Sequence, residues 1–573
     1  MINFLPATNK EMKARGWDHV DIILVTGDAY VDHPSFGIAL IGRLLEAQGY
    51  RVAVLSQPRY DTADSFRVFG PPRLFWGISS GNLDSIVANY SSNRKVRDQD
   101  SYSPGGNPYF DREKVKKERR RPDRATLLYA NLARRAFTDK TPIILGGLEA
   151  SLRRFVHYDY QQKKLRSSVL TDAKADLLIY GMGERAVLEA AERLAKGNDL
   201  TDIPGTCLRL TDREMADLEI PSEKLITLPS WQKINREPES FLETELRIDK
   251  QARASDHHVL SQHQQAMWII QNPPAAPLTS GELDRLYALP FTRKPHPEFG
   301  EVPAWRMIRN SLTIVRGCCG NCSFCGISRH QGAAVTYRSE KSILQEIQKI
   351  AEDNDFDGTI TDLGGPTANL YGVKCRKGGC KSRDCLYEKI CPHLNIEEEI
   401  FISLLKQAVR INKVKHVFIS SGLRMEIMLQ TPRLLKEIIL KHTPGVLKIA
   451  PEHTESHILS LMHKPDIEIM EDFLALCRRI GKENNRKVHL TPYLISSHPG
   501  CTVDDMKQMV RKIKAAGLKV KQFQDFTPTP GTISTAMYVA GLGRNDLRPI
   551  HIPRGDKERR EQRQTLEKCL PGQ

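Results

Sequence analysis

The chain has 573 residues, of which 40% are hydrophobic and 27% charged; this composition excludes a fibrous or disordered protein and leaves room for about two to four domains. Lysine and arginine total 84 against 69 acidic residues, and the resulting net charge of +15 favours anionic partners such as RNA, nucleotides or an acidic electron donor. The 12 cysteines are clustered, which indicates metal ligation in a reducing compartment and not a disulfide framework.

Residues 1–15 are mostly polar and lack the apolar centre of a secretory signal. No later run of about 18 apolar residues predicts a membrane span. We therefore expect a cytoplasmic protein.

Residues 1–200 predict an α/β domain with a doubly wound parallel sheet, because short apolar runs alternate with helical patterns. The predicted strands are 21–27, 50–55, 75–79, 142–147 and 176–181. Ligands of such sheets bind at the carboxyl ends of the strands. The residues expected at that edge are Gly27, Asp28, Asp32, His33, Gly146, Gly147, Gly181, Gly183 and Glu184.

This half resembles a flavodoxin-like cobalamin-binding domain. The ligand motif of that family is D-x-H-x-x-G, whereas Asp32 and His33 are adjacent here, in residues 32–37. We therefore expect His33 to be a loop histidine with local hydrogen bonds and not a cobalamin ligand.

Three segments interrupt the regular pattern. Residues 90–124 form a basic insertion whose run 114–124 is either a solvated face or a grip on a phosphate backbone. Residues 201–300, with Pro273, Pro274 and Pro277, predict an irregular linker that wraps between two domains. The charged tail, 546–573, predicts a solvated helix or disorder.

Residues 301–545 predict a second α/β domain, a partial (β/α)6 TIM-like barrel. Its strands begin with the run before residue 316 and continue at 359–366, 417–422, 447–453, 489–495 and 520–526. The active site of such a barrel lies where the carboxyl ends of the strands meet.

Cys318, Cys322 and Cys325 follow the first of these strands with the spacing C-x3-C-x2-C. Three thiolates can hold three irons of a four-iron cubane and leave the fourth iron open. Structural zinc, with Cys319 as a further ligand, is the alternative, although zinc sites more often contain paired C-x2-C units.

The stretch 316–332, including Phe324 before the third cysteine, resembles the signature of the radical S-adenosylmethionine (SAM) superfamily. The resemblance implies a [4Fe–4S] cluster whose open iron binds SAM, and reductive SAM cleavage to a 5′-deoxyadenosyl radical. It also implies an electron donor such as reduced flavodoxin or ferredoxin.

The resemblance further assigns SAM contacts to other strand ends. Gly364, Gly365 and Pro366 occupy the place of the family's Gly-Gly-Glu motif, and Ser420, Ser421 and Gly422 the place that holds the ribose or carboxylate of SAM. Arg424 is expected to pair with the SAM carboxylate, and Glu452 and His453 to contact the ribose or handle protons. Loop capping and packing is the alternative for all of them.

A second cysteine set contains Cys375, Cys380, Cys385 and Cys391. A second Fe–S cluster or a structural zinc ion suits four thiolates, and free loop cysteines are the alternative. Pieces spread over the barrel, at 330–332, 362–369, 450–453, 496–500 and 527–532, resemble the YgiQ family of radical SAM proteins along nearly the whole chain. The sequence thus predicts a radical SAM enzyme of unidentified substrate, with an Fe–S RNA-binding or sensory protein without SAM turnover as the alternative.

Overall fold

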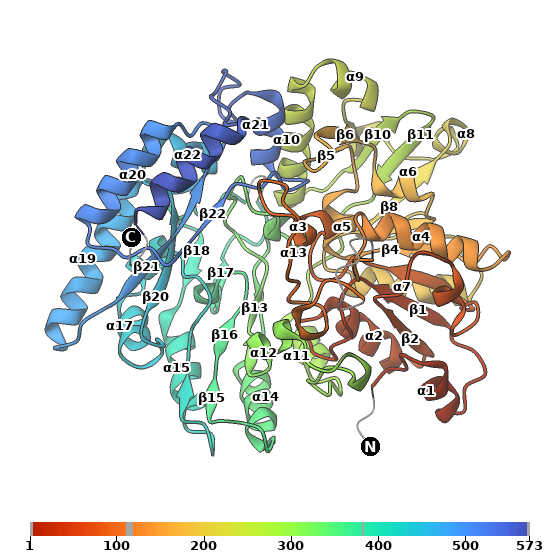
Figure 1. Ribbon diagram of the computed structural model, residues 1–573, viewed down its shortest axis with the longest axis horizontal. Helices are drawn as coiled ribbons and strands as arrows, with labels where there is room; N and C mark the ends of the chain where they lie inside the picture. Colours follow the sequence, from red (N-terminus) through yellow and green to blue (C-terminus); the bar gives the residue numbers. More distant parts are fainter. Residues whose placement is uncertain (1–3, 111–117, 381–382, 570–573) are drawn as a thin grey trace.

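The computed structural model describes residues 4–110, 118–380 and 383–569. Figure 1 shows an N-terminal half built on one large sheet, beside a C-terminal half built on parallel strands with helices outside them. No helix of the described residues is both long and apolar enough to cross a lipid bilayer.

The N-terminal sheet has nine strands in the order β2-β1-β3-β4-β7-β8-β11-β10-β9. Its first five strands are β1 (Ile22–Thr26), β2 (Val52–Ser56), β3 (Phe75–Ile78), β4 (Ile143–Leu145) and β7 (Leu177–Ile179). These five pair in parallel, as predicted for a doubly wound sheet. The strand order reverses between β1 and β3, which is where ligands of such sheets bind.

Helices cover both faces of these strands: α2 (Gly37–Ala47) and α7 (Glu184–Ala195) on one face, α4 (Ala125–Ala136) and α6 (Val169–Ala173) on the other. Ile22 and Leu24 of β1 pack into the core on the α2 face, and Ile23 and Val25 into the core on the α4 face. A strand buried on both faces reads as a continuous apolar run, which is why its sequence was recognisable.

Residues 201–300 are not the irregular linker that the sequence predicts. They contain β8 (Thr206–Leu210), β9 (Leu225–Thr227), β10 (Val259–Gln264) and β11 (Met267–Gln271). The strands β7, β8, β11 and β10 pair antiparallel to one another and extend the parallel sheet. The remaining elements of this half are α1 (Asn9–Ala14), α3 (Ser85–Asn89), α5 (Gly147–Leu152), β5 (His157–Asp159), β6 (Lys164–Arg166), α8 (Asp212–Ala216), α9 (Trp231–Arg236), α10 (Glu239–Arg253), α11 (Ser280–Tyr287) and α12 (Pro303–Ile308).

The C-terminal half contains the predicted partial barrel. Its strands are β12 (Ser311–Thr313), β15 (Thr359–Ile360) with β16 (Asp362–Gly364), β19 (His416–Val417), β20 (Leu447–Glu452), β21 (Leu490–Ser496) and β22 (Gln522–Asp525). Neighbouring strands pair in parallel, and a parallel bridge from Leu423 to Ile449 joins the first group of strands to β20.

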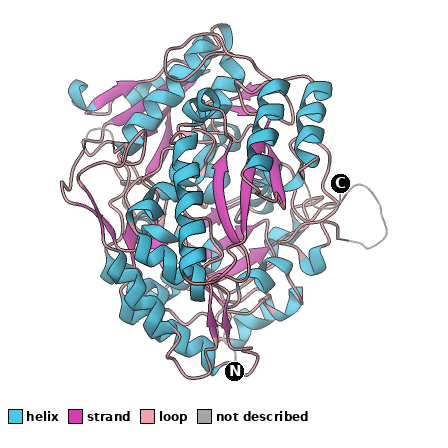
Figure 2. Cartoon of the chain, turned by 90° about the vertical axis from the view of Figure 1, so that its left-hand side faces the viewer, coloured by secondary structure: helices cyan, strands magenta, loops and turns pink. Residues whose placement is uncertain are grey.

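Helices lie outside the barrel strands, as Figure 2 shows for the half that faces the viewer. They include α14 (Glu340–Glu352), α15 (Glu398–Ala408), α17 (Pro432–Lys441), α19 (Ile467–Glu483) and α20 (Val503–Ala515). The shorter helices α16 (Met425–Gln430) and α18 (Ser456–Met462) also belong to this half, and α21 (Ile533–Ala540) packs against α10 of the N-terminal half. In α14, Ser339 caps the first turn, and Ile343, Ile347 and Ile350 form the stripe that packs into the barrel core.

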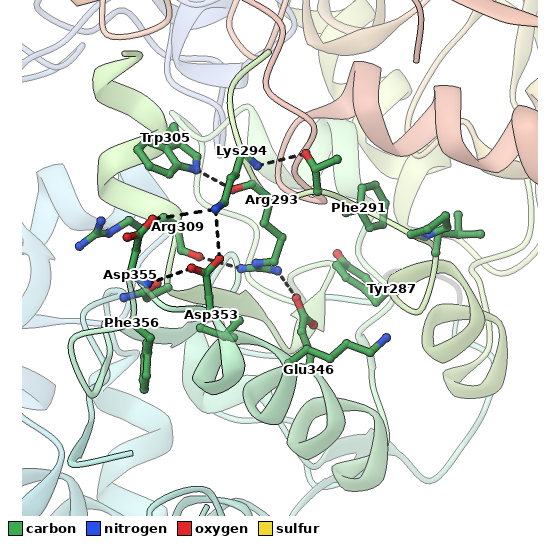
Figure 3. A pocket seen from close by; sticks show the side chains of 16 residues that line it. Tyr287, Phe291, Arg293, Lys294, Trp305, Arg309, Glu346, Asp353, Asp355 and Phe356 are labelled. Carbon is green, nitrogen blue, oxygen red and sulfur yellow. Dashed lines mark hydrogen bonds and ion pairs between the residues drawn. The ribbon is translucent and has the colours of Figure 1, made fainter. Parts of the chain in front are cut away.

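A cavity of about 220 Å³ lies at the amino ends of the barrel strands, between α12 and α14 (Figure 3). Arg293 crosses it, donating to Glu346 and, from Nη2, to the carbonyl oxygen of Ser311 at 2.9 Å. Trp305 Nε1 donates to the carbonyl oxygen of Arg293 at 2.7 Å. This end of a barrel serves stability, so we assign these contacts to the junction of the two halves and not to the active site.

The charged tail folds back onto the barrel. Its helix α22 (Asp556–Glu567) contacts α20, β21 and β22. Gln562 is fully buried, with Nε2 donating to the carbonyl oxygen of Cys501 at 2.9 Å and Oε1 accepting from Ser497 N at 2.8 Å. The tail through residue 569 is therefore part of the barrel and neither solvated on all sides nor disordered.

Candidate functional site

The loop 317–335, the cluster loop, follows β12 and is closed at its base by β13 (Val315–Arg316) and β14 (Thr336–Tyr337), which pair antiparallel. Gly317 has φ +75°, and a Cβ there would lie 1.9 Å from the carbonyl oxygen of Ala334, so only glycine fits. The amide of Cys318 donates to the Gly332 carbonyl and that of Cys325 to the Cys322 carbonyl, both at 3.1 Å. These constraints curl the loop and bring its cysteines together.

The three cysteines of the motif interact electrostatically. Burial raises the pKa of the Cys325 thiol to about 12, and the nearby Cys322 and Cys318 raise it further. Burial also raises the pKa of Cys318. Because three neighbouring thiolates in a buried site repel one another, the site favours a cationic occupant, as an iron cluster with thiolate ligands requires.

Arg424 supplies a fixed positive charge beside the cysteines. Its Nη1 lies 3.9 Å from Cys322 Sγ, and its Nε donates to Glu426 Oε1 at 2.7 Å. Burial alone would lower the pKa of Arg424, but Glu426 and the cysteines outweigh burial and the pKa is raised. A Cβ on Gly320 would lie 2.4 Å from Arg424 Nη1, so this second glycine makes room for the guanidinium.

The strand ends β16 and β19 are held together by Asp362. Asp362 Oδ1 accepts from the amides of Ser420 at 2.8 Å and Ser421 at 3.1 Å, and its Oδ2 accepts from the Ser421 hydroxyl. A Cβ on Gly364 would meet Asp362 and Ser421 at 2.3–2.4 Å, and one on Gly365 would lie 2.4 Å from the carbonyl oxygen of Val315. The two predicted SAM segments are therefore adjacent and close to the base of the cluster loop.

The residues that follow these two segments add further hydrogen bonds between them. Thr367 Oγ1 donates to the Gly422 carbonyl at 2.9 Å, directly after Pro366. Asn369 Nδ2 donates to the Arg424 carbonyl at 2.9 Å, and its Oδ1 accepts from the Arg424 amide at 3.1 Å. Arg424 is thus positioned from the same segment that carries Gly364 to Pro366.

Glu452 ends β20 in a conformation that is rare for its residue type, with φ +68°. Its side chain is buried, its Oε2 has no hydrogen-bond partner among the described residues, and burial raises its pKa. Lys464 Nζ lies 3.9 Å from its Oε1. Its neighbour His453 is instead enclosed, with Nε2 3.5 Å from Cys501 Sγ and Nδ1 accepting from the Glu455 amide at 3.1 Å. Backbone strain and a buried carboxylate oxygen without a hydrogen bond mark Glu452, more than His453, as a candidate functional residue.

The second cysteine set lies in a loop, residues 376–393, between β17 (Val373–Cys375) and β18 (Leu394–Ile396). Cys375 is exposed, and the amide of Cys391 donates to the Cys385 carbonyl at 2.9 Å. Cys319 lies close enough to Cys385 to lower the pKa of the Cys385 thiol to about 7, so this loop lies next to the cluster loop. Within residues 4–110, 118–380 and 383–569, no three Cys, His, Asp or Glu side chains converge on a single metal position, so the structure arranges neither this set nor the three cysteines of the cluster loop around a metal ion.

The carboxyl edge of the N-terminal sheet borders a cavity of about 520 Å³. Of the residues expected there, the cavity is lined by Asp28, Gly146, Gly147, Gly181, Gly183 and Glu184. Gly27, Asp32 and His33 do not line it; His33 is buried and its Nδ1 accepts from the Ser35 amide at 3.1 Å. Arg316, at the base of the cluster loop, pairs with Glu184 at 2.5 Å and closes the gap between the two halves.

Sequence reasoning missed Asp362, Asn369, Glu426 and the contact between Cys319 and Cys385. An acidic residue near the carboxyl end of a buried strand was a usable signal for Asp362. Asn369 and the cysteine contact depend on segments far apart in the chain, and no local pattern marks them. Glu426 pairs with Arg424 two residues before it, but only the folded chain places that pair beside Cys322.

Two family models match the chain: "Radical SAM N-terminal" at residues 4–311 and "Radical SAM superfamily" at residues 312–513. A UPF0313 protein of Geobacter sulfurreducens is 43% identical over 578 residues, covering 100% of this chain and 93% of that protein. One of Thermotoga neapolitana is 43% identical over 576 residues, covering 98% of each. Among solved structures, the radical SAM methyltransferase TsrM from Kitasatospora setae aligns with a TM-score of 0.48 and 14% identity, covering 89% of this chain and 74% of that one. The chain therefore belongs to the UPF0313, or YgiQ, family of radical SAM enzymes, which cleave S-adenosylmethionine with an iron–sulfur cluster.

Proposed function

We propose that Cys318, Cys322 and Cys325 hold the [4Fe–4S] cluster and that SAM binds between it and the ends of β16 and β19. The observation that carries this proposal is the set of three half-buried thiols that influence one another electrostatically, with Arg424 beside Cys322, after the first barrel strand. A reduced cluster of this type supplies the electron that cleaves the sulfonium of SAM and starts radical chemistry.

The chain's own residues have distinct parts in this proposal. Gly364, Gly365 and Pro366 offer backbone groups to the SAM amino group, while Ser420, Ser421 and Gly422 line the neighbouring wall. Asp362 positions that wall through the amides of Ser420 and Ser421. Arg424 balances the charge of the thiolates, and the free oxygen of Glu452 remains available for a ribose hydroxyl or a proton.

The proposal includes the domain limits predicted above, with one change. The N-terminal domain extends from residue 1 to about residue 300, because β8 to β11 complete its sheet. The basic insertion 90–124 belongs to it, the barrel spans 301–545, and the tail that follows packs on that barrel through residue 569. The protein is proposed to work in the cytoplasm, where a reducing environment keeps thiols from forming disulfides.

For the reductant, we propose an acidic flavodoxin- or ferredoxin-type donor, which the net charge of +15 supports. The cysteines 375, 380, 385 and 391 are proposed to hold a second Fe–S cluster or zinc after rearrangement of their loop. The contact of Cys385 with Cys319 favours this position for electron entry, since it lies next to the cluster loop.

RNA is the substrate class that the insertion 90–124 supports. In its described part, Arg119 lies 5.5 Å over the ring of Tyr109 and Arg120 lies 5.1 Å over that of Phe110, a combination of cations and aromatic rings typical of single-stranded nucleic-acid sites. Arg121, in contrast, is buried between Asp28 and Asp100 and has a structural role. Lys114, Lys116 and Lys117 lie outside the described residues.

The test of SAM cleavage uses anaerobically reconstituted protein, dithionite and SAM, with 5′-deoxyadenosine measured by chromatography. We expect slow formation without substrate. Binding of SAM to an intact cluster without any 5′-deoxyadenosine would favour the sensory alternative.

A separate experiment tests the substrate class. We expect tRNA binding whose affinity falls steeply between low and physiological salt, because bound cations release counterions. If no binding remains near physiological salt, RNA is struck from the proposal. Incubation with deuterated candidate substrates then identifies the hydrogen that reaches 5′-deoxyadenosine.

A further inference from the structure

A second cavity, of about 120 Å³, lies between the N-terminal domain and the far side of the cluster loop. The β7–α7 turn and the extended segment 274–278 form one side of it. Residues 328–334, which include most of α13 (Ile327–Gln331), form the other. The proposed SAM contacts at β16 and β19 do not line this cavity.

Arg154 lines the cavity and is only 5% exposed. Its Nε donates to Gln271 Oε1 at 2.7 Å and its Nη1 to the Ser151 carbonyl at 2.5 Å. No carboxylate of the described residues lies within ion-pair distance, 4.0 Å, of this guanidinium. Burial, followed by smaller contributions that include the nearby Arg329, lowers its pKa. A buried cation without a counter-charge is costly, so its neighbourhood favours an anion.

Arg329, from the cluster loop, adds a second buried arginine, which has carboxylate partners but keeps one nitrogen without a hydrogen bond. It is 8% exposed and lines the same cavity, and its Nη1 has no hydrogen-bond partner among the described residues. Its nearest carboxylates, on Glu245 and Asp249, are both 3.5 Å away, and Asp249 pairs more closely with Arg253, at 2.7 Å.

The imidazole of His258 also borders the cavity, and its buried Nδ1 likewise lacks a hydrogen-bond partner in the described chain.

We propose that this cavity binds the anionic group, a carboxylate or phosphate, of a small molecule, with Arg154 and Arg329 as its direct partners. Two arginines from separate elements with unused donor capacity form a built anion site, because charge-assisted hydrogen bonds are the strongest that such a group can receive.

The adjoining cavity of about 520 Å³ indicates the chemical nature of the rest of the ligand. The two cavities share Gly181, Met182, Glu184, Arg316, His330 and Gln331 as a common wall. Beyond this wall the lining is largely aliphatic, with Ile38, Ile41 and Leu148 among its members, and its charged residue Asp28 is already paired with Arg121. The ligand therefore combines an anionic head with an apolar body, and it binds where the parallel strands of the N-terminal sheet end.

The test uses the full, anaerobically reconstituted chain with three probes: inorganic phosphate, 3-phenylpropionate and the neutral 3-phenylpropionamide. Binding is measured by calorimetry and by the rise in Tm. We expect 3-phenylpropionate to bind about tenfold or more tightly than its amide, because one charged hydrogen-bonding group distinguishes them. Phosphate should bind more weakly than 3-phenylpropionate, because it lacks the apolar body.

Two variants assign the effect to the site. Arg154→Met should weaken binding of both anions about tenfold or more and leave the amide unaffected, whereas Arg154→Lys retains part of the affinity. Arg306→Met, at an exposed arginine of α12, is the matched control and should change nothing. Equal affinity for 3-phenylpropionate and its amide in the unsubstituted protein, or no binding of either anion, would overturn the proposal even if Arg154→Met fails to fold. Anion binding that survives Arg154→Met in a folded protein would also overturn it.

Discussion

The two cysteine loops of the barrel differ in what surrounds their thiols. The cluster loop is fixed by backbone hydrogen bonds, by a glycine against the Ala334 carbonyl and by Arg424 against Cys322. The loop 376–393 starts and ends at the surface, and a Cβ on its Gly378 would meet nothing within 4 Å. Closely spaced cysteines occur in both, so spacing alone does not make a site; charge balance and close packing around the thiols do.

The largest expected effect separates the thiols of the two loops. Cys322→Ala should abolish the EPR signal of the reduced cluster and the formation of 5′-deoxyadenosine, because one ligand of three is lost. Cys319→Ala and Cys385→Ala should retain both signals. Loss of the cluster in Cys319→Ala alone would contradict the assignment of ligands.

The second largest effect is expected from loss of the ion pair between Arg424 and Glu426, beside the cluster loop. Arg424→Met leaves the buried carboxylate of Glu426 unpaired and should lower the free energy of unfolding of the cluster-free protein by about 3–5 kcal/mol. Urea unfolding measures this change. The double variant Arg424→Met/Glu426→Leu removes both charges and should recover most of the loss; a double variant as unstable as the single one would show that the pair is not the cause.

Alanine substitutions at one glycine in each loop compare the packing of the two loops directly. Gly320→Ala places a methyl group 2.4 Å from Arg424 Nη1 and should cost about 1–3 kcal/mol of stability, together with part of the cluster content. Gly379→Ala meets its nearest atom at 3.5 Å and should stay within about 0.5 kcal/mol. Equal effects in denaturation experiments would mean that the loops are packed alike.

The smallest expected effect concerns metal in the second loop. A variant with alanine at Cys318, Cys322 and Cys325 should still purify with some iron or zinc, and elemental analysis should show that this metal disappears when Cys380 and Cys385 are also replaced. The amount should be low, because the loop must rearrange to gather its thiols. A folded variant without metal after anaerobic reconstitution would remove the second site.

The fold was predictable where strands are buried on both faces, since β1 and β2 read as apolar runs. The strands β10 and β11 were not predictable, because they contain buried glutamines, and glutamine in a sequence suggests an exposed position. Gln262 Oε1 accepts from the Val156 amide at 3.1 Å and Gln264 Oε1 from the Ser168 amide at 2.8 Å, partners more than 90 residues away. Polar residues that are satisfied only by distant segments carry no local signal of burial.

In the candidate site, too, some residues were predictable from the sequence and others were not. The cysteines and glycines were identifiable from spacing and turn chemistry alone. The approach of Arg424 to Cys322, by contrast, joins positions 102 residues apart. The sequence contains these residues, but only the folded chain defines their roles.

The ion pair of Arg316 with Glu184 has a consequence for how the enzyme matures. Arg316 is the residue directly before the cluster loop, and both partners are buried, so the loop is fastened to the N-terminal domain from behind. Arg544 Nη1 holds the same loop from the barrel side, donating to Ser323 Oγ at 2.7 Å. Because Cys318, Cys322 and Cys325 remain partly exposed, these contacts leave the cysteines accessible, and iron and sulfide would be added to a loop that both halves of the protein already hold in position.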